Sequence, residues 1–261
     1  MNKVSALLMP AGCCFLALAC TASKMSYHAD QALIARKGAP VAVLADINLI
    51  DDAVEDTLLV DVARDKSYGG LILNHFEERL KEKKYNVGNL ALTSVGLLVD
   101  RTRIYRLSST AIDNEGTLPF IRAPFYLNEA IRDDSSIVSG LAETYRTLLT
   151  IPVETLSSRR FFPVTDSLGA RFQGETLICL ILGGYIVPEN ARIRERPAAV
   201  PYGRGLESEA KVTQISLTMY ILDAKEGSVL WSDQAVSIGG NVNTNKLLHL
   251  ADELIEGLPL L

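Results

Sequence analysis

The sequence predicts an α/β domain, in which a small mixed β-sheet is flanked by helices and followed by a C-terminal β-hairpin and a closing helix. Three observations indicate it. A near-continuous apolar run over residues 177–187 is typical of a buried strand. Strict alternation over residues 212–223, followed by a turn and a second apolar stretch, predicts a hairpin. Leucines at helical spacing over residues 243–258 predict a helix with one buried face.

The first 20 residues predict export. Lys3 is followed by an apolar segment from Val4 to Ala19, in the pattern of a secretory signal peptide. That segment is short for a membrane-spanning helix, which needs about 20 apolar residues. An uncleaved membrane anchor remains the alternative on this pattern.

The sequence ALAC, which ends at Cys20, resembles the lipobox of bacterial lipoproteins. The resemblance implies cleavage before Cys20 and a cysteine that carries a thioether-linked diacylglycerol and an amide-linked acyl chain such as palmitate. Cys13 and Cys14 compete for this role, but too little apolar sequence precedes them. Thr21 stands where an aspartate would imply retention in the inner membrane, so the resemblance implies the outer membrane, facing the periplasm.

Residues 1–19 are thus interpreted as a signal peptide, residues 20–38 as a polar tether, and residues 39–261 as a single domain. The net charge of −5, or −6 without Lys3 of the leader, makes nucleic acid a poor partner. Cys179 is the one cysteine after Cys20, so no internal disulfide is possible. Its apolar surroundings predict a buried side chain and not a nucleophile.

The elements of the domain follow in chain order. Residues 40–47 predict a strand, and residues 57–63 a second strand or a short helix. An amphipathic helix is predicted over 67–84, with a Glu77–Lys81 pair at i,i+4 and with no predicted partner for His75. The other predicted elements are strand pieces at 85–93 and 103–107, a turn at 113–116, a helix over 135–148 capped by Asp134 or Ser135, a short helix within 163–172, the strand over 177–187, the hairpin over 212–238, and a helix over 244–258 capped by Asn243 or Thr244.

The hairpin is predicted to bury one face, made by Ile215, Leu217, Met219 and Ile221. Trp231, on its second strand, is predicted to pack in the core and not to stack on a ligand.

Two stretches resemble a known domain. LGARFQGETLICLILGGYIV places a short glycine-containing helix before a long apolar strand, and SLTMYILDAKEGSVLWS carries Asp223, Gly227 and Trp231 around its turn. Over residues 40–258 the pattern resembles the α/β domain shared by the TolB amino-terminal region, the curli-secretion lipoprotein CsgG and the lipoprotein activators of penicillin-binding proteins. The resemblance implies a binding module of the cell envelope without shared catalytic residues.

Two basic stretches are candidate partner-binding sites. Arg192, Arg194 and Arg196 alternate within a proline- and glycine-rich segment, residues 188–211, and Arg159 and Arg160 are adjacent. Long loops inside compact domains are often functional, and these arginines suit an acidic partner. A solvated insertion without function is the alternative for residues 188–211.

No motif of a nucleotide-binding loop, serine hydrolase or zinc protease is present, and no catalytic residue, cofactor or metal is predicted. Two acidic clusters remain, at Asp46, Asp51, Asp52, Glu55 and Asp56 and at Asp133 and Asp134. Paired carboxylates cleave glycans in many hydrolases, and several oxygen ligands bind Ca²⁺. The second cluster is explained by helix capping.

The sequence therefore favours a non-enzymatic envelope lipoprotein that binds a protein partner or associates with itself. A secretion pore of the CsgG type is the first alternative. Its only candidate barrel strands are residues 97–107 and 118–127, and Pro119 and Pro124 argue against them. The second alternative is an envelope glycan hydrolase that uses Asp51 and Asp52.

Overall fold

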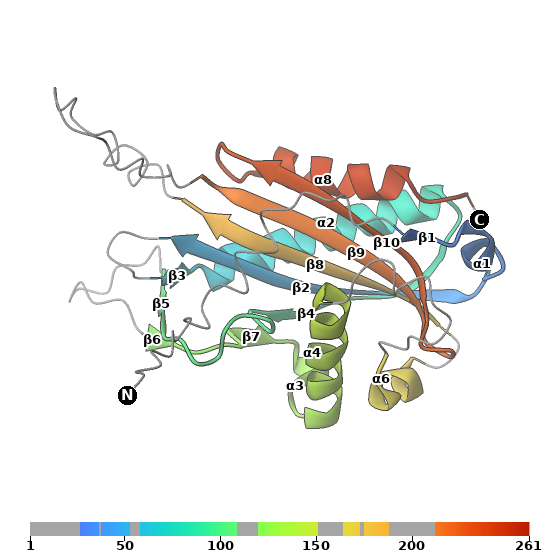
Figure 1. Cartoon of the computed structure of the whole chain (residues 1–261), viewed down its shortest axis with the longest axis horizontal. Helices are drawn as coiled ribbons and strands as arrows, with labels where there is room; N and C mark the ends of the chain where they lie inside the picture. Colours follow the sequence, from blue (N-terminus) through green and yellow to red (C-terminus); the bar gives the residue numbers. More distant parts are fainter. Residues whose placement is uncertain are drawn as a thin grey trace, which may run out of the picture.

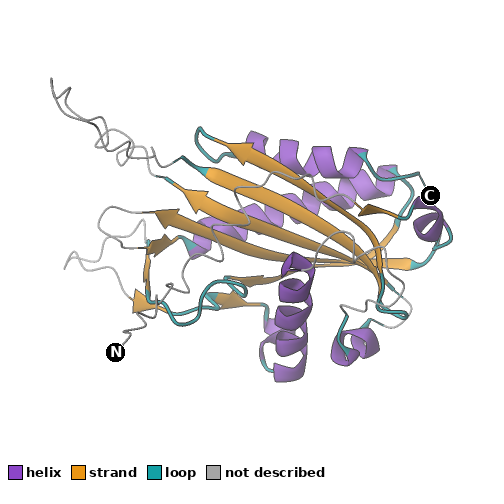
Figure 2. Cartoon of the chain, in the orientation of Figure 1, coloured by secondary structure: helices purple, strands orange, loops and turns teal. Residues whose placement is uncertain are grey.

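A computed structural model describes residues 27–36, 38–52, 58–108, 120–150, 164–172, 175–187 and 212–260. In these residues a ten-stranded mixed sheet carries helices on both faces (Figures 1 and 2). The predicted α/β class, with its C-terminal hairpin and closing helix, is confirmed, but the sheet is larger than predicted. Within the described part of the chain, no helix is both long and apolar enough to cross a membrane.

The elements have the following bounds. The strands are β1 (Tyr27–His28), β2 (Pro40–Asp52), β3 (Leu58–Val60), β4 (Asn86–Val95), β5 (Tyr105–Leu107), β6 (Phe120–Ile121), β7 (Tyr126–Leu127), β8 (Thr176–Ile186), β9 (Gln214–Asp223) and β10 (Val229–Ile238). The helices are α1 (Asp30–Ile34), α2 (Val62–Glu82), α3 (Glu129–Arg132), α4 (Ser135–Thr150), α6 (Asp166–Arg171) and α8 (Thr244–Glu256).

The central strand of the sheet is β2. It pairs in parallel with β8 on one side and with β4 on the other, and its last residues pair with β3. Antiparallel strands β9 and β10 follow β8, and β1 lies at the outer edge of β10. Parallel strands in the middle of a sheet are covered on both faces. This position explains the unbroken apolar runs of β2 and β8.

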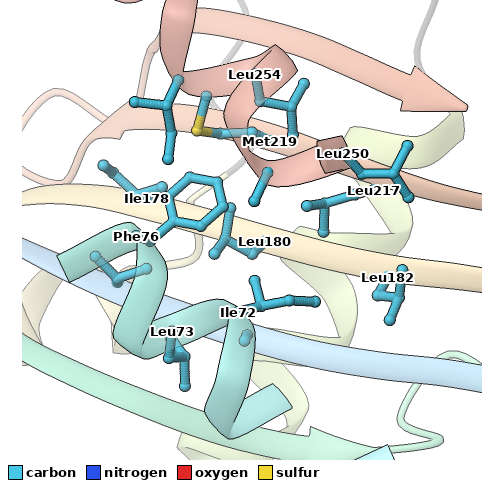
Figure 3. Packing of buried hydrophobic residues seen from close by; sticks show 14 of the residues in the cluster. Ile72, Leu73, Phe76, Ile178, Leu180, Leu182, Leu217, Met219, Leu250 and Leu254 are labelled. Carbon is cyan, nitrogen blue, oxygen red and sulfur yellow. The ribbon is translucent and has the colours of Figure 1, made fainter. Parts of the chain in front are cut away.

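Two layers of helices build two cores. Helices α2 and α8 pack on one face, where Phe76, Leu250 and Leu254 meet side chains of β8 and β9 such as Leu180 and Met219 (Figure 3). Helices α4 and α6 pack on the other face, over side chains that include Leu44, Leu177 and Tyr220. Successive residues of one strand therefore alternate between the two cores.

The hairpin differs from its prediction because both of its faces are covered. Ile215, Leu217, Met219 and Ile221 face the α2–α8 layer as predicted, but Tyr220 and Leu222 are also buried, in the α4–α6 core. The prediction of a single buried face was therefore wrong.

The predicted tether reaches less far than expected. β1 pairs with β10, and Leu33 of α1 is fully buried, so residues 27–36 belong to the domain. His28 stacks on Trp231 with ring centroids 4.6 Å apart. Trp231 is itself fully buried, which confirms its predicted packing role.

Helix boundaries follow their caps. α2 begins at Val62 and not at 67, because the side chain of Asp61 accepts a hydrogen bond from Arg64 N (2.9 Å). Residues 57–63 thus contain both the short strand β3 and the start of helix α2. The predicted caps Asp134 of α4 and Asn243 of α8 are confirmed, whereas helix α3 was not predicted.

Candidate binding surface at the strand ends

The residues that the sequence singles out for function lie mostly outside the described part of the chain. This holds for Cys20, and for the arginines at positions 159, 160, 192, 194 and 196. The described residues on the two sides of segment 188–211 lie together. Val187 N donates a hydrogen bond to Thr213 Oγ1 (3.0 Å), so the chain leaves and re-enters the described structure at one place, the end of β8.

The first acidic cluster does not converge on one site. Asp46 and Asp51 lie on opposite faces of β2, with Asp46 on the side of α4. Asp46 is fully buried and accepts hydrogen bonds from Ser94 Oγ and Asn48 Nδ2, each at 2.7 Å. Burial raises the pKa of Asp46 to about 6, against these hydrogen bonds, which lower it. The carboxyl group is thus engaged in joining β2 to β4.

Asp51 lies on the side of α2, where Arg64 holds it. Arg64 Nη1 lies 2.7 and 3.0 Å from the two oxygens of Asp51, and Arg64 Nε donates to Asp65 at 2.9 Å. Burial raises the pKa of Asp65 to about 7, although the Arg64 charge opposes it, and burial raises the pKa of Asp51 as well. This cluster ties the end of β2 to the first turn of α2. The side chains of Asp52, Glu55 and Asp56 are outside the described residues.

Other candidate chemical groups are also engaged. The sequence indicated no partner for His75, and the structure supplies one. His75 Nε2 lies 2.8 Å from Asp252 Oδ1, which also accepts from Arg79 Nε (3.1 Å), so the group joins α2 to α8. Cys179 is buried as predicted, and burial raises the pKa of its thiol to about 12. Among the described residues, no three side chains of His, Cys, Asp or Glu are placed to share a metal ion.

Exposed apolar side chains gather where β8 and β10 end. Tyr185 is 37% exposed, Val236 38% and Ile238 68%. The registers place Tyr185 and Ile238 on either side of Gln214, on the sheet face that α4 covers further back. Figure 1 shows these strands extending past α4. The helical layer therefore leaves this end of the sheet face open.

A second apolar group lies at the same end, on the far side of β2. Phe120 is 70% exposed and Ile104 56%. Together with Ile121 and Arg122 they line a shallow, open hollow of about 250 Å³. The guanidinium carbon of Arg106 lies 5.2 Å from the centre of the Phe120 ring. The registers connect this group to the end of β2 through β3 and β5.

The two groups lie at the same end of the sheet but on opposite faces, because Phe120 and Arg106 align through Leu59 with Asp51 on the α2 side, whereas Tyr185 and Ile238 lie on the α4 side. We call the residues of both groups the strand-end surface, which comprises Ile104, Arg106, Phe120, Arg122, Tyr185, Val212, Val236 and Ile238. Arg101 and Arg103 beside it are exposed too, and Asp100, the acid among them, pairs with Arg103 at 3.4 Å. Aromatic residues and arginine are enriched at protein interfaces. In open α/β sheets, ligands bind at the carboxyl ends of the parallel strands. The arrangement is therefore suited to binding a macromolecular surface.

Sequence reasoning missed this surface. Residues 97–107 and 118–127 were weighed as long pore strands, but their described parts contain only β5, β6 and β7, each of two or three residues. The arginines and the aromatic side chain at Arg106, Phe120 and Arg122 are a weak signal in the sequence from which a binding surface could have been predicted. Their proximity to Tyr185 follows only from strand order, which the sequence does not state.

Comparisons with known proteins add little. No protein-family model matches the chain. No curated protein matches it either. Among solved structures, the lipoprotein GNA1162 from Neisseria meningitidis is similar over 82% of this chain and 96% of its own, with 13% identity and a TM-score of 0.28. A PelC dodecamer from Paraburkholderia phytofirmans is similar over 81% of this chain and 83% of its own, with 7% identity and a TM-score of 0.28. These values assign neither a family nor a function, and the resemblance to TolB and CsgG remains a prediction.

Proposed function

We propose that the chain is a lipoprotein of the bacterial cell envelope, anchored at Cys20 in the outer membrane and facing the periplasm, which binds a protein partner and catalyses no reaction. The strand-end surface is the observation that carries the binding role. It exposes apolar side chains at the carboxyl end of the sheet on both faces, with Phe120 and Ile104 on the α2 side and Tyr185 and Ile238 on the α4 side.

The charge of the surface indicates an acidic partner. Arg106 and Arg122 border Phe120, and the segment that carries Arg192, Arg194 and Arg196 begins directly after Val187, at the end of β8. Since the protein as a whole is acidic, with a net charge of −5, this local excess of arginine would orient an acidic partner toward one end of the sheet.

The engagement of the described carboxylates supports a non-catalytic role. A glycosidase needs two carboxyl groups about 5–10 Å apart across a substrate. Asp46 is fully buried against Ser94 and Asn48, and Asp51 is held by Arg64 on the opposite face of the sheet. Neither is placed to share a substrate with the other.

The test is crosslinking in intact cells, followed by affinity capture of the lipidated protein from membranes and mass spectrometry. We expect one stoichiometric partner. Reversing the charges of Arg192, Arg194 and Arg196, or replacing Ile238→Asp, should reduce its capture at least about tenfold, the loss typical of an interface hot spot. Leu260→Asp is the matched control, because Leu260 is equally exposed (69%) and lies outside the strand-end surface.

Unchanged capture with both sets of variants would remove the strand-end surface from the proposal. Recovery of the chain alone, in large crosslinked species, would replace a separate partner by self-association. Loss of function on Asp51→Asn, with capture of the partner preserved, would favour the hydrolase alternative instead.

A further inference from the structure

The outer edge of β10 is only partly occupied. β1 pairs with it at two positions, Tyr27 with Ser232 and His28 with Trp231. β10 continues for six more residues, from Asp233 to Ile238, and in the described part of the chain no strand pairs with this stretch from outside. An uncovered edge of this length can pair with another strand. The question is which segment takes it.

The hydrogen-bonding groups of this edge point outward at alternate residues. Gly239 N donates to Thr213 O (2.7 Å), so odd-numbered residues of this stretch face β9. Gln234, Val236 and Ile238 therefore direct their backbone N–H and C=O groups away from β9. Gln234 N–H is bonded to the neighbouring Asp233 side chain (2.8 Å), while the side chains of Val236 and Ile238 are exposed. The outward backbone groups of this stretch of β10 are therefore placed to pair with a further strand, and one face of the stretch is apolar.

The chain itself supplies a segment of the right length and direction. We propose that residues 20–26, which lie outside the described residues, continue β1 along β10 in the mature protein. Counting back from the Tyr27–Ser232 pair places residue 26 opposite Asp233, residue 21 opposite Ile238, and Cys20 opposite Gly239. The six residues that precede Tyr27 thus match in number the six positions of β10 that no described strand pairs from outside. The inference rests on the proposed function in one respect, that Cys20 is the lipidated first residue.

The two existing pairs fix which way the side chains alternate. Tyr27 packs against the α4–α6 core, and His28 stacks on Trp231 in the α2–α8 core. Continuing this alternation puts Met25 and Ser23 on the same face as Val236 and Ile238, so Met25 would cover exposed apolar surface. Ser26 would lie opposite Asp233, whose Oδ2 lies 3.9 Å from His28 Nε2, and its hydroxyl could donate to that carboxylate.

The consequence concerns orientation. With residues 20–26 in the sheet, the acyl chains would leave the domain beside Gly239, next to Val212 and the strand-end surface. The domain would then be held close to the membrane in one orientation, and a partner would meet the strand-end surface near the membrane. A flexible tether of the same length would allow many orientations.

The test is a disulfide between the two strands in the lipidated full-length protein. Residues 22 and 237 form a non-hydrogen-bonded pair in this register, whose Cα atoms lie about 4.5 Å apart, within the usual disulfide range. Ala22→Cys with Ser237→Cys should therefore give an intramolecular disulfide after export. Ser23→Cys with Ser237→Cys is the matched control, because a shift of one residue turns the side chain to the other face. Buried Cys179 does not interfere.

A disulfide in the first variant, at least about tenfold more abundant than in the control, supports the inference. Equal yields in both variants would indicate a mobile tether and overturn it, and so would a disulfide in neither. A disulfide-linked dimer would assign the edge to a second copy and also overturn it. Incorporation of labelled palmitate is measured in the same samples. A disulfide without incorporated label would contradict the lipid anchor at Cys20 but support the pairing of residues 20–26 with β10. Incorporated label without the disulfide would support the anchor but contradict the pairing.

Discussion

Asp46 shows how one buried side chain stabilises the junction of β2 with the loop after β4. Its carboxyl group accepts from Ser94 Oγ and Asn48 Nδ2, and Leu97 N approaches it at 3.4 Å. Asn48 in turn accepts from Leu98 N (3.1 Å). The two side chains thus satisfy backbone groups of the chain as it turns away from the sheet. A buried acid of this kind is costly when charged, so the junction should depend on pH.

The first prediction concerns this pH dependence. The folded pKa of Asp46, about 6, lies above the unfolded value of 3.8, so the folded state holds the proton more tightly. Its contribution to stability is therefore complete below about pH 4 and is lost as pH rises through 6. The loss is about 3 kcal/mol at most. Denaturant unfolding between pH 4 and 7.5 should show this decrease, and Asp46→Asn should make it smaller by about the same amount, because the Ser94 hydroxyl can turn to accept from the new amide. The part of the decrease that comes from Asp65, whose pKa burial raises to about 7, should remain.

The control for Asp46 is Asp134→Asn. Asp134 is an exposed helix cap whose pKa is lowered, chiefly by the hydrogen bond from the Ser136 side chain, so its pH dependence falls below pH 4. That variant should change the stability little at neutral pH, because asparagine caps a helix about as well as aspartate, and should leave the slope between pH 4 and 7.5 intact. A slope that is unchanged in Asp46→Asn would show that Asp46 does not contribute to it, with Asp65 the first group to examine in its place.

Residue-level roles were the least predictable from the sequence. Asp46 was recognised as part of an acidic cluster, but its bond to Ser94 joins residues far apart in the chain. The same holds for His75 and Asp252, which meet only because α2 and α8 pack side by side. Burial and partners of a polar side chain depend on which strands become neighbours, and no local pattern records that.

At the scale of elements, local patterns predict more. The strand over 177–187, the helix over 244–258 and the cap at Asp134 are present near their predicted positions. Their signals are local, since apolar spacing and a capping side chain lie within a few residues. The second buried face of the hairpin was missed because it depends on a helix more than 60 residues earlier in the chain, α4.

The second prediction concerns the pairing of β8 with β9. Gly184 has φ +151°, and a Cβ there would lie 2.2 Å from Gln214 O, whereas Gly183 has nothing within 4 Å of that position. Gly184→Ala should lower the free energy of unfolding by about 2–4 kcal/mol, since strain and overpacking add. Gly183→Ala should change it by less than about 1 kcal/mol. Urea unfolding of both variants checks this, and equal effects would show that the strand ends adjust freely.

At the scale of the whole molecule, the two ends of the sheet differ in how far the helices cover them. Helices cover both faces over the first part of β8. At the other end the apolar Tyr185, Ile238 and Phe120 are exposed, and Arg106 lies beside Phe120. This exposure does not help the protein to fold, which is why the binding role is proposed for this end.

The third prediction concerns how the whole molecule is held in the envelope. If Cys20 carries the anchor, labelled palmitate should enter the wild-type protein and the protein should sediment with outer membranes. Each buried methylene contributes about 0.8 kcal/mol, so one chain binds only marginally and two or more hold firmly. Cys20→Ser should abolish labelling and membrane retention together. Cys13→Ser with Cys14→Ser should keep both, because cleavage removes those positions. Labelling that persists in Cys20→Ser but is lost in the double variant would move the anchor into the leader, and residues 20–26 would then lack a lipid to position at the end of β10.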